Sequence, residues 1–369
     1  MGGTAEPGDA REALRAGVEF APGGAVSGAR RLKGGLIHRS FALRCAAGPP
    51  LLLQRLNTAI FRRPDRLIEN VARVAEHLRR KLAAEGCPDP QRRCLELVPT
   101  HAGPLLHVDA QGDVWRAFRF IEGAASHEKP DGLEQARRAA FAFGDFARRL
   151  ADLDDPPLHE TIPRFHDFAG RVEALEAALR ADRCGRGRAA RPEVVALRAR
   201  CAEVARALAD QGAERLPRRA VHHDCKLENL LFDAVSGEAL CVIDLDTVMP
   251  GALLSDFGEL VRSSTNTASE DEPDASRVDF DLEVFDALAR GYLAGAGPIL
   301  TAGERASLAL AGPLLTLMNA VRFLTDHLEG DTYFAIERTG HNLDRARAQL
   351  RLAERMLAQQ PAMRARVMA

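Results

Sequence analysis

The fold is decided by VHHDCKLENLLFD, residues 221–233, and by GEALCVIDLDTVMPGALLSDFGELVR, residues 237–262. Two strand-like runs, NLLFD and ALCVIDLD, flank a Ser-Gly turn at residues 236 and 237 and stand alone among helical stretches. The hairpin and the residues before it hold the densest set of reactive side chains in the chain, namely His222, His223, Asp224, Lys226, Glu228, Asn229, Asp244, Asp246 and Asp256. Such a set needs a chemical explanation.

Phosphoryl transfer from a nucleotide supplies that explanation. It needs a carboxylate that orients and deprotonates the acceptor hydroxyl, hard oxygen ligands for magnesium, and a cation near the transferred group. Asp224 is the predicted base, and Lys226 is the predicted cation. Only four of the fifty basic residues are lysines, which makes a lysine at this place informative. Asn229 and Asp244 are the predicted magnesium ligands, because Asp244 ends an apolar strand that returns beside Asn229 across the hairpin.

The loop HHDCKLEN, residues 222–229, resembles the His-x-Asp-x-Lys-x-x-Asn loop of protein kinases, and DLD, residues 244–246, stands where those enzymes carry Asp-Phe-Gly. The wider sequence resembles the aminoglycoside phosphotransferase superfamily over about residues 30–355, and within it most closely the N-acetylhexosamine 1-kinases. The other stretches that carry this resemblance are LLLQRLNTAIFRRPDRLIENV (51–71), VWRAFRFIEG (114–123), RFLTDHLEGDTYF (322–334) and HNLDRARAQLRL (341–352).

The resemblance implies a bilobal kinase-like fold with ATP and Mg²⁺ between the lobes and a small hydroxylated substrate, with an N-acetylhexosamine phosphorylated at its anomeric hydroxyl as the best single prediction. It places Arg322 and Tyr333 at the sugar. An arginine offers fixed donors to hydroxyl or acetamido oxygens, and a tyrosine ring offers an apolar face. His38 stands where the family commonly has an asparagine in an N-terminal turn, a difference that concerns substrate identity rather than phosphate chemistry.

The nucleotide side of the site is expected on two segments. The adenine should meet the crossing segment near residues 120–123, with Phe120 and Glu122 as candidate contacts. Gln54 and Arg55 lie in the strand where protein kinases keep a lysine, and strand alternation puts them on opposite faces, so only one can point at the nucleotide. Position in the motif favours Gln54, while charge favours Arg55.

The chain reads as an α+β protein of two lobes, because 369 residues suit two domains better than one. Residues 1–30, rich in Gly, Ala and Pro, are expected to be loosely ordered. Residues 31–121 predict a nucleotide-binding lobe of antiparallel strands with one helix over 64–84. Residues 122–369 predict a helical lobe that holds the catalytic loop and the substrate site. Apolar stripes in this lobe predict helices over 133–150, 166–181, 192–210, 278–294, 301–327 and 334–358.

Composition excludes several classes of protein. Fifty basic residues against 52 acidic ones leave a net charge of −2, so there is no overall basic field for a nucleic acid. The seven cysteines follow no metal-binding or disulfide spacing, which is typical of reduced thiols in a cytosol. The first twenty residues do not read as a signal peptide, and no apolar run is predicted to span a bilayer. We therefore expect a cytoplasmic enzyme that contacts neither nucleic acid nor membrane.

Three alternatives stay open at this point. A metal-dependent hydrolase would use the histidines and aspartates of the hairpin as transition-metal ligands, but it gives Lys226 and Asn229 no role. A catalytically silent kinase-like module is disfavoured, because the base, the lysine and both magnesium ligands are all present. A kinase of another sugar, an aminoglycoside or an amino alcohol would need only different side chains in the helical lobe.

Overall fold

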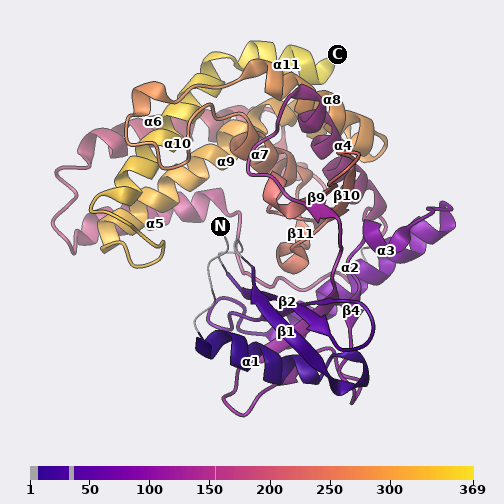
Figure 1. Ribbon diagram of the computed structural model, residues 1–369. Helices are drawn as coiled ribbons and strands as arrows, with labels where there is room; N and C mark the ends of the chain where they lie inside the picture. The colour runs from indigo at the N-terminus through magenta and orange to yellow at the C-terminus, as the bar shows by residue number, and fades with distance from the viewer. Residues whose placement is uncertain (1–6, 33–36, 154) are drawn as a thin grey trace.

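The computed structural model describes residues 7–32, 37–153 and 155–369, and it has two lobes (Figure 1). The N-terminal lobe is a twisted antiparallel sheet whose strand order is β1-β2-β3-β6-β4, with β5 also paired to β6. The strands are β1 (Val26–Arg31), β2 (Arg39–Cys45), β3 (Leu51–Arg55), β4 (Leu97–Val98), β5 (His107–Val108) and β6 (Val114–Arg119). The predicted α+β kinase-like fold is confirmed.

Helix α2 (Pro64–Ala84) coincides with the helix predicted over 64–84. A proline at its first position and Asp65 in its first turn suit a helix start, where backbone N–H groups are unpaired and negative charge is favoured. Its buried stripe includes Leu67, Val71 and Val74. The short helix α3 (Pro90–Arg93) follows it. Within residues 31–121, where one helix was predicted, the structure therefore has α3 in addition to α2.

Helix α1 (Pro7–Val18) and strand β1 contradict the expectation of a loosely ordered start, as far as residues 1–30 are described. Ala13, Ala16 and Phe20 are buried against the sheet together with Leu43. A Cβ added at Gly17 would lie 2.5 Å from Leu43 Cδ1, so a side chain at this position would have to displace Leu43. The Gly and Ala content that suggested loose order instead permits tight packing.

The C-terminal lobe is built of helices around a small hairpin (Figure 1). Strand β9 (Leu230–Asp233) pairs with β10 (Ala239–Val242) and with β7 (Ala124–Ala125), while β8 (Arg219–Val221) pairs with β11 (Met249–Gly251). The helices are α4 (Leu133–Arg149), α5 (Phe168–Ala181), α6 (Arg191–Asp210), α7 (Leu253–Ser264), α8 (Leu282–Ala296), α9 (Ala302–Glu329), α10 (His341–Ala358) and α11 (Gln360–Met368).

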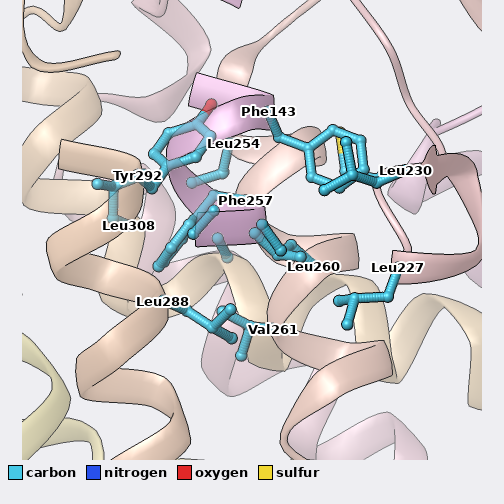
Figure 2. Packing of buried hydrophobic residues seen from close by; sticks show 14 of the residues in the cluster. Phe143, Leu227, Leu230, Leu254, Phe257, Leu260, Val261, Leu288, Tyr292 and Leu308 are labelled. Carbon is cyan, nitrogen blue, oxygen red and sulfur yellow. The ribbon is translucent and has the colours of Figure 1, made fainter. Parts of the chain in front are cut away.

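The core of this lobe surrounds α7, as Figure 2 shows. Phe257 of α7 packs 5.0 Å from the Tyr292 ring of α8, and a Cβ at Gly258 would lie 2.5 Å from the Ala311 carbonyl of α9. Leu227 and Leu230, which flank the end of the catalytic loop, are fully buried in the same core. Burial of a leucine contributes about 1.5–3 kcal/mol, so the core holds the loop in place.

Helix α9 crosses this core and begins with the Thr301–Glu304 capping box. It is the one helix in the described part of the chain that is long and apolar enough to cross a membrane, but 78% of its apolar 18-residue window is buried inside the protein. The helix ends at Gly330 (φ 100°). A Cβ there would lie 3.2 Å from Sγ of Cys184, an exposed thiol.

Candidate active site

The catalytic loop is anchored by a carboxylate from the first turn of α7. Asp256 is fully buried, and its two oxygens accept hydrogen bonds from the backbone N–H groups of His222 (3.0 Å) and His223 (2.7 Å). The carboxylate also lies at a helix N-terminus, where negative charge is favoured. Asp256 therefore fixes the backbone that leads into Asp224.

His222 supports the loop rather than the reaction. Its Nδ1 accepts a hydrogen bond from the Asp224 backbone N–H (3.2 Å), and its Nε2 therefore donates to the Ile243 carbonyl (2.9 Å). Both ring nitrogens are thus used inside the protein. A hydrolase that binds a metal through His222 is not supported by this geometry, and the described residues contain no group of three His, Cys, Asp or Glu side chains placed to hold a metal ion.

Asp224 is partly exposed and is oriented by its neighbours on the loop. Its Oδ2 accepts a hydrogen bond from Asn229 Nδ2 (2.7 Å), and the Lys226 ammonium lies 3.6 Å from the same oxygen. Burial alone would lower the pKa of Lys226, but the charges of Asp224 and Glu228 outweigh burial and raise it. The lysine is therefore charged, and it stands beside the candidate base.

Asn229 and Asp244 lie at the paired ends of the hairpin. The Ile243 N–H donates to the Asn229 carbonyl (2.9 Å), so Asp244 directly follows the residue that pairs with Asn229. Asn229 Nδ2 also bonds the Asp224 carbonyl (2.8 Å), so its Oδ1 is the amide atom that is left for a metal. That the two side chains bind one magnesium ion stays a prediction.

The surroundings of Asp244 fit a divalent cation. Its backbone has the left-handed conformation (φ 59°, ψ 57°) at the start of the turn Leu245–Thr247. Burial raises the pKa of Asp244 to about 7, and the neighbouring carboxylates of Asp246 and Asp224 add to the effect. A carboxylate whose charge is disfavoured in this way is stabilised by a bound cation, and oxygen ligands suit magnesium or calcium.

Asp246 joins the two lobes. Arg116 of β6 donates to both of its carboxylate oxygens (2.5 and 2.6 Å), and His38 Nε2 lies 2.6 Å from Oδ2. The Asn57 N–H donates to His38 Nδ1 (3.0 Å), so Nε2 carries the proton and donates to Asp246. Burial alone would raise the pKa of Asp246, but the charge of Arg116 and these hydrogen bonds hold it well below its usual range.

Arg116 was not identified from the sequence. The available signal was an arginine between the apolar residues Trp115 and Ala117, where only a partner makes burial of a charge tolerable. Its side chain is 2% exposed.

The structure answers the question of Gln54 and Arg55. Gln54 faces the C-terminal lobe, where its Oε1 accepts hydrogen bonds from Arg116 Nε (3.0 Å) and Nη2 (2.8 Å). Arg55 faces the other way and pairs with Glu12 of α1 (3.2 Å) and Asp113 (2.8 Å). Arg55 is therefore removed from the candidate nucleotide contacts, because the face on which it lies is covered by α1.

The crossing segment that carries Phe120 and Glu122 is fixed to the hairpin. The Glu122 carbonyl accepts a hydrogen bond from Arg92 Nη2 (3.1 Å), which also bonds Asp233 of β9 (2.9 Å). The Phe120 N–H donates to the Pro50 carbonyl (3.1 Å), and the residue is half-buried. Both stay candidate adenine contacts: Phe120 through its ring, and Glu122 only through atoms other than the carbonyl that Arg92 already occupies.

Arg322 and Tyr333 are brought together at the end of α9. The Arg322 guanidinium lies 6.0 Å from the Tyr333 ring centroid and donates to Asn319 Oδ1 (3.0 Å). Tyr333 is 67% exposed, and its backbone is held by Asp326, which accepts a hydrogen bond from its N–H (2.8 Å).

His166 contacts the catalytic loop and was missed by the sequence reasoning. Its Nδ1 lies 3.2 Å from Nδ1 of His223, the neighbour of Asp224. Burial lowers the pKa of His166 to about 3, and the charges of Arg322 and Arg171 lower it further.

Comparisons with known proteins agree with this architecture. The model of the phosphotransferase enzyme family matches residues 28–309. The structure is similar to an aminoglycoside phosphotransferase from Alicyclobacillus acidocaldarius (TM-score 0.64, 13% identity, 100% of this chain and 98% of that one). It is also similar to a microcompartment-associated aminopropanol kinase (TM-score 0.59, 18% identity, 95% and 98% covered) and to spectinomycin phosphotransferase solved with ADP and spectinomycin (TM-score 0.60, 11% identity, 95% and 99% covered).

At these identities the solved structures show the fold, while the family model covers well over half of the chain. The chain therefore belongs to the phosphotransferase enzyme family and is a phosphotransferase that acts on a hydroxyl group.

Proposed function

We propose that the chain is an ATP- and magnesium-dependent kinase that phosphorylates an N-acetylhexosamine at its anomeric hydroxyl. The observation that carries the proposal is the hydrogen bond between Asn229 Nδ2 and Asp224 Oδ2 (2.7 Å), because it joins the candidate base to a candidate metal ligand. Asp244 follows Ile243, whose N–H bonds the Asn229 carbonyl, so the candidate metal ligands come from adjacent strand ends.

The chemistry assigns a role to each side chain. Asp224 Oδ2 is occupied by Asn229, which leaves Oδ1 to accept the proton of the acceptor hydroxyl as its oxygen bonds to the γ-phosphorus. The bond between that phosphorus and the β,γ-bridging oxygen breaks, and ADP leaves. Lys226 places a positive charge beside the reacting groups. Asn229 Oδ1 and Asp244 would hold magnesium, which when bound neutralises charge on the phosphates.

The substrate end favours a sugar over an amine. The Arg322 guanidinium lies 6.0 Å from the centroid of the Tyr333 ring, and Tyr333 is 67% exposed. A guanidinium donates hydrogen bonds to hydroxyl and acetamido oxygens, and the tyrosine ring offers an apolar face to a sugar ring. A cationic aminoglycoside or amino alcohol would bring its charge next to that of Arg322.

The setting proposed for this enzyme is the cytoplasm. All seven cysteines are free thiols, and burial raises the pKa of Cys94, Cys201 and Cys241. Free thiols are typical of a reducing compartment.

The test is to incubate the protein with magnesium and ATP against N-acetylhexosamines, other sugars, aminoglycosides and amino alcohols, with ³¹P NMR of the product. The expected result is ADP together with a sugar phosphate whose reducing end is lost, since an anomeric phosphate blocks ring opening. Asp224→Asn is the control for a contaminating kinase. Phosphorylation of an amine substrate alone, or of a sugar at another hydroxyl, would refute the proposed acceptor.

A further inference from the structure

Strand β3 carries no cation on the face that looks toward the C-terminal lobe. Gln54 occupies that face, and Arg55 points to α1. Protein kinases place a lysine on this strand to hold the nucleotide phosphates. The function proposed above therefore requires that this charge come from another element of the protein.

The neighbouring strand supplies a candidate. Arg116 of β6 is the direct cross-strand partner of Gln54, and directly paired residues project from the same face of a sheet. Its guanidinium reaches Asp246, two residues beyond the candidate metal ligand Asp244. Arg116 thus lies on the face of the sheet from which the loop that carries Asp244 is contacted.

The hydrogen bonds of Arg116 leave room for a ligand. A guanidinium has five N–H groups in a fixed fork. Four are directed at protein acceptors, two at Gln54 Oε1 and two at Asp246. The fifth, on Nη1, has no acceptor among residues 7–32, 37–153 and 155–369. A buried N–H of a charged group strongly favours an oxygen partner.

We propose that Arg116 binds the phosphates of the nucleotide and takes the place of the β3 lysine of kinases. Asp246 and Gln54 hold the guanidinium in position, and the remaining N–H donates to a phosphate oxygen. This inference rests on the function proposed above, since it assumes that a nucleotide enters between the lobes.

The test separates recognition of phosphate from recognition of the rest of the nucleotide. Calorimetric titrations with adenosine and with ADP, both in magnesium, are made on the unchanged protein and on Arg116→Met. A hydrogen bond to a charged group is worth about 1.5–3 kcal/mol, which corresponds to a loss of roughly 10- to 100-fold in ADP affinity. The adenosine affinity should stay within about twofold, because adenosine has no phosphate.

A matched control is available on the same strand. Arg119 lies three residues along β6, hence on the opposite face, and pairs with Glu96 at 2.9 Å. Arg119→Met removes the same kind of side chain and should leave both affinities unchanged. If Arg116→Met does not fold, Arg116→Lys is used instead, because it keeps the charge but not the fork. It should lower the affinity for ADP and not that for adenosine.

Two results would be decisive against the assignment. Equal weakening of adenosine and ADP in the Arg116 variant would show that the arginine only supports the lobe, and an unchanged preference for ADP would show that it does not meet the phosphates. Failure of the proposed function is distinguishable from both, because the unchanged protein would then bind ADP no better than adenosine.

Discussion

Arg116 and Asp246 lie 130 residues apart in the sequence and form a two-point ion pair, with nitrogen–oxygen distances of 2.5 and 2.6 Å, between the sheet and the loop that carries Asp244. Each side chain is 2% exposed. Because a buried charge without its partner is costly, the pair ties the geometry of the candidate metal site to the position of the N-terminal lobe.

Breaking this pair should destabilise the protein. Asp246→Asn leaves Arg116 buried with a neutral partner, and loss of one member of a buried ion pair typically lowers the free energy of unfolding by about 3–5 kcal/mol. Urea denaturation measures the change. The control is Glu76→Gln, which opens the exposed pair with Arg79 and should leave the unfolding midpoint nearly unchanged. Equal shifts in the two variants would contradict a special role for the buried pair.

Asp224→Asn should lower turnover by at least about 100-fold, the usual scale for loss of a general base, with nucleotide affinity nearly unchanged. Steady-state kinetics and ADP titration measure the two effects. Glu228→Gln makes the same change of charge on the same loop, 3.9 Å from Lys226, and should retain most of the activity. A normal turnover number in Asp224→Asn would remove this residue from the mechanism.

Without metal, stability should depend on pH through Asp244. Its pKa is raised to about 7 by burial, so the folded state binds this proton more tightly than the unfolded state does. The resulting stabilisation is complete at low pH and is lost as the pH rises toward about 7. In EDTA, the free energy of unfolding of Asp244→Asn minus that of the unchanged protein should therefore increase as the pH rises from about 5 to about 8. Both proteins are titrated with urea at intervals of roughly one pH unit. A constant difference over this range would contradict the assignment.

The same site should prefer magnesium or manganese to zinc, because Asn229 and Asp244 offer oxygen ligands only. Magnesium added at pH 8 should raise the thermal midpoint of the unchanged protein and have little effect on Asp244→Asn. Differential scanning calorimetry is the measurement. Activity restored by zinc alone, with hydrolysis of a phosphate ester in the absence of ATP, would instead support the hydrolase alternative.

Arg322→Ala should raise the Michaelis constant for the sugar by the equivalent of about 1.5–3 kcal/mol, the range for a charge-assisted hydrogen bond, while the constant for ATP barely moves. Arg347→Ala, on the surface of α10, is the matched control. Weaker ATP binding with sugar affinity intact would leave the substrate site unplaced.

Local patterns were sufficient to predict the hairpin and α2, because both depend on periodicity and turn residues within a few positions of each other. Strand pairing alone predicts that Asn229 and Asp244 come from adjacent strand ends. Helix α10 was predicted to begin at residue 334 but begins at His341. The carboxylate of Asp326 accepts hydrogen bonds from the backbone N–H groups of Thr332 and Phe334. These bonds hold the residues after α9 in a non-helical conformation, so the next helix begins later.

The side chains that join the lobes could not be predicted in this way. Strand alternation separates Gln54 from Arg55, but only the packing of α1 decides which face is covered. Arg116 and His38 acquire their roles from Asp246, which comes from the other lobe and from a distant part of the sequence. Such contacts depend on the tertiary arrangement, which a periodic pattern does not contain.

The exposed thiol of Cys184 offers a route to real-time observation of this enzyme. Five of the other cysteines are buried, and Cys87 is partly buried. Cys184 lies beside Gly330, and Gly330 precedes Tyr333 by three residues. A maleimide fluorophore attached there would sit next to the segment that carries the candidate sugar contact. Its emission could then follow substrate arrival in a stopped-flow instrument without any engineered cysteine.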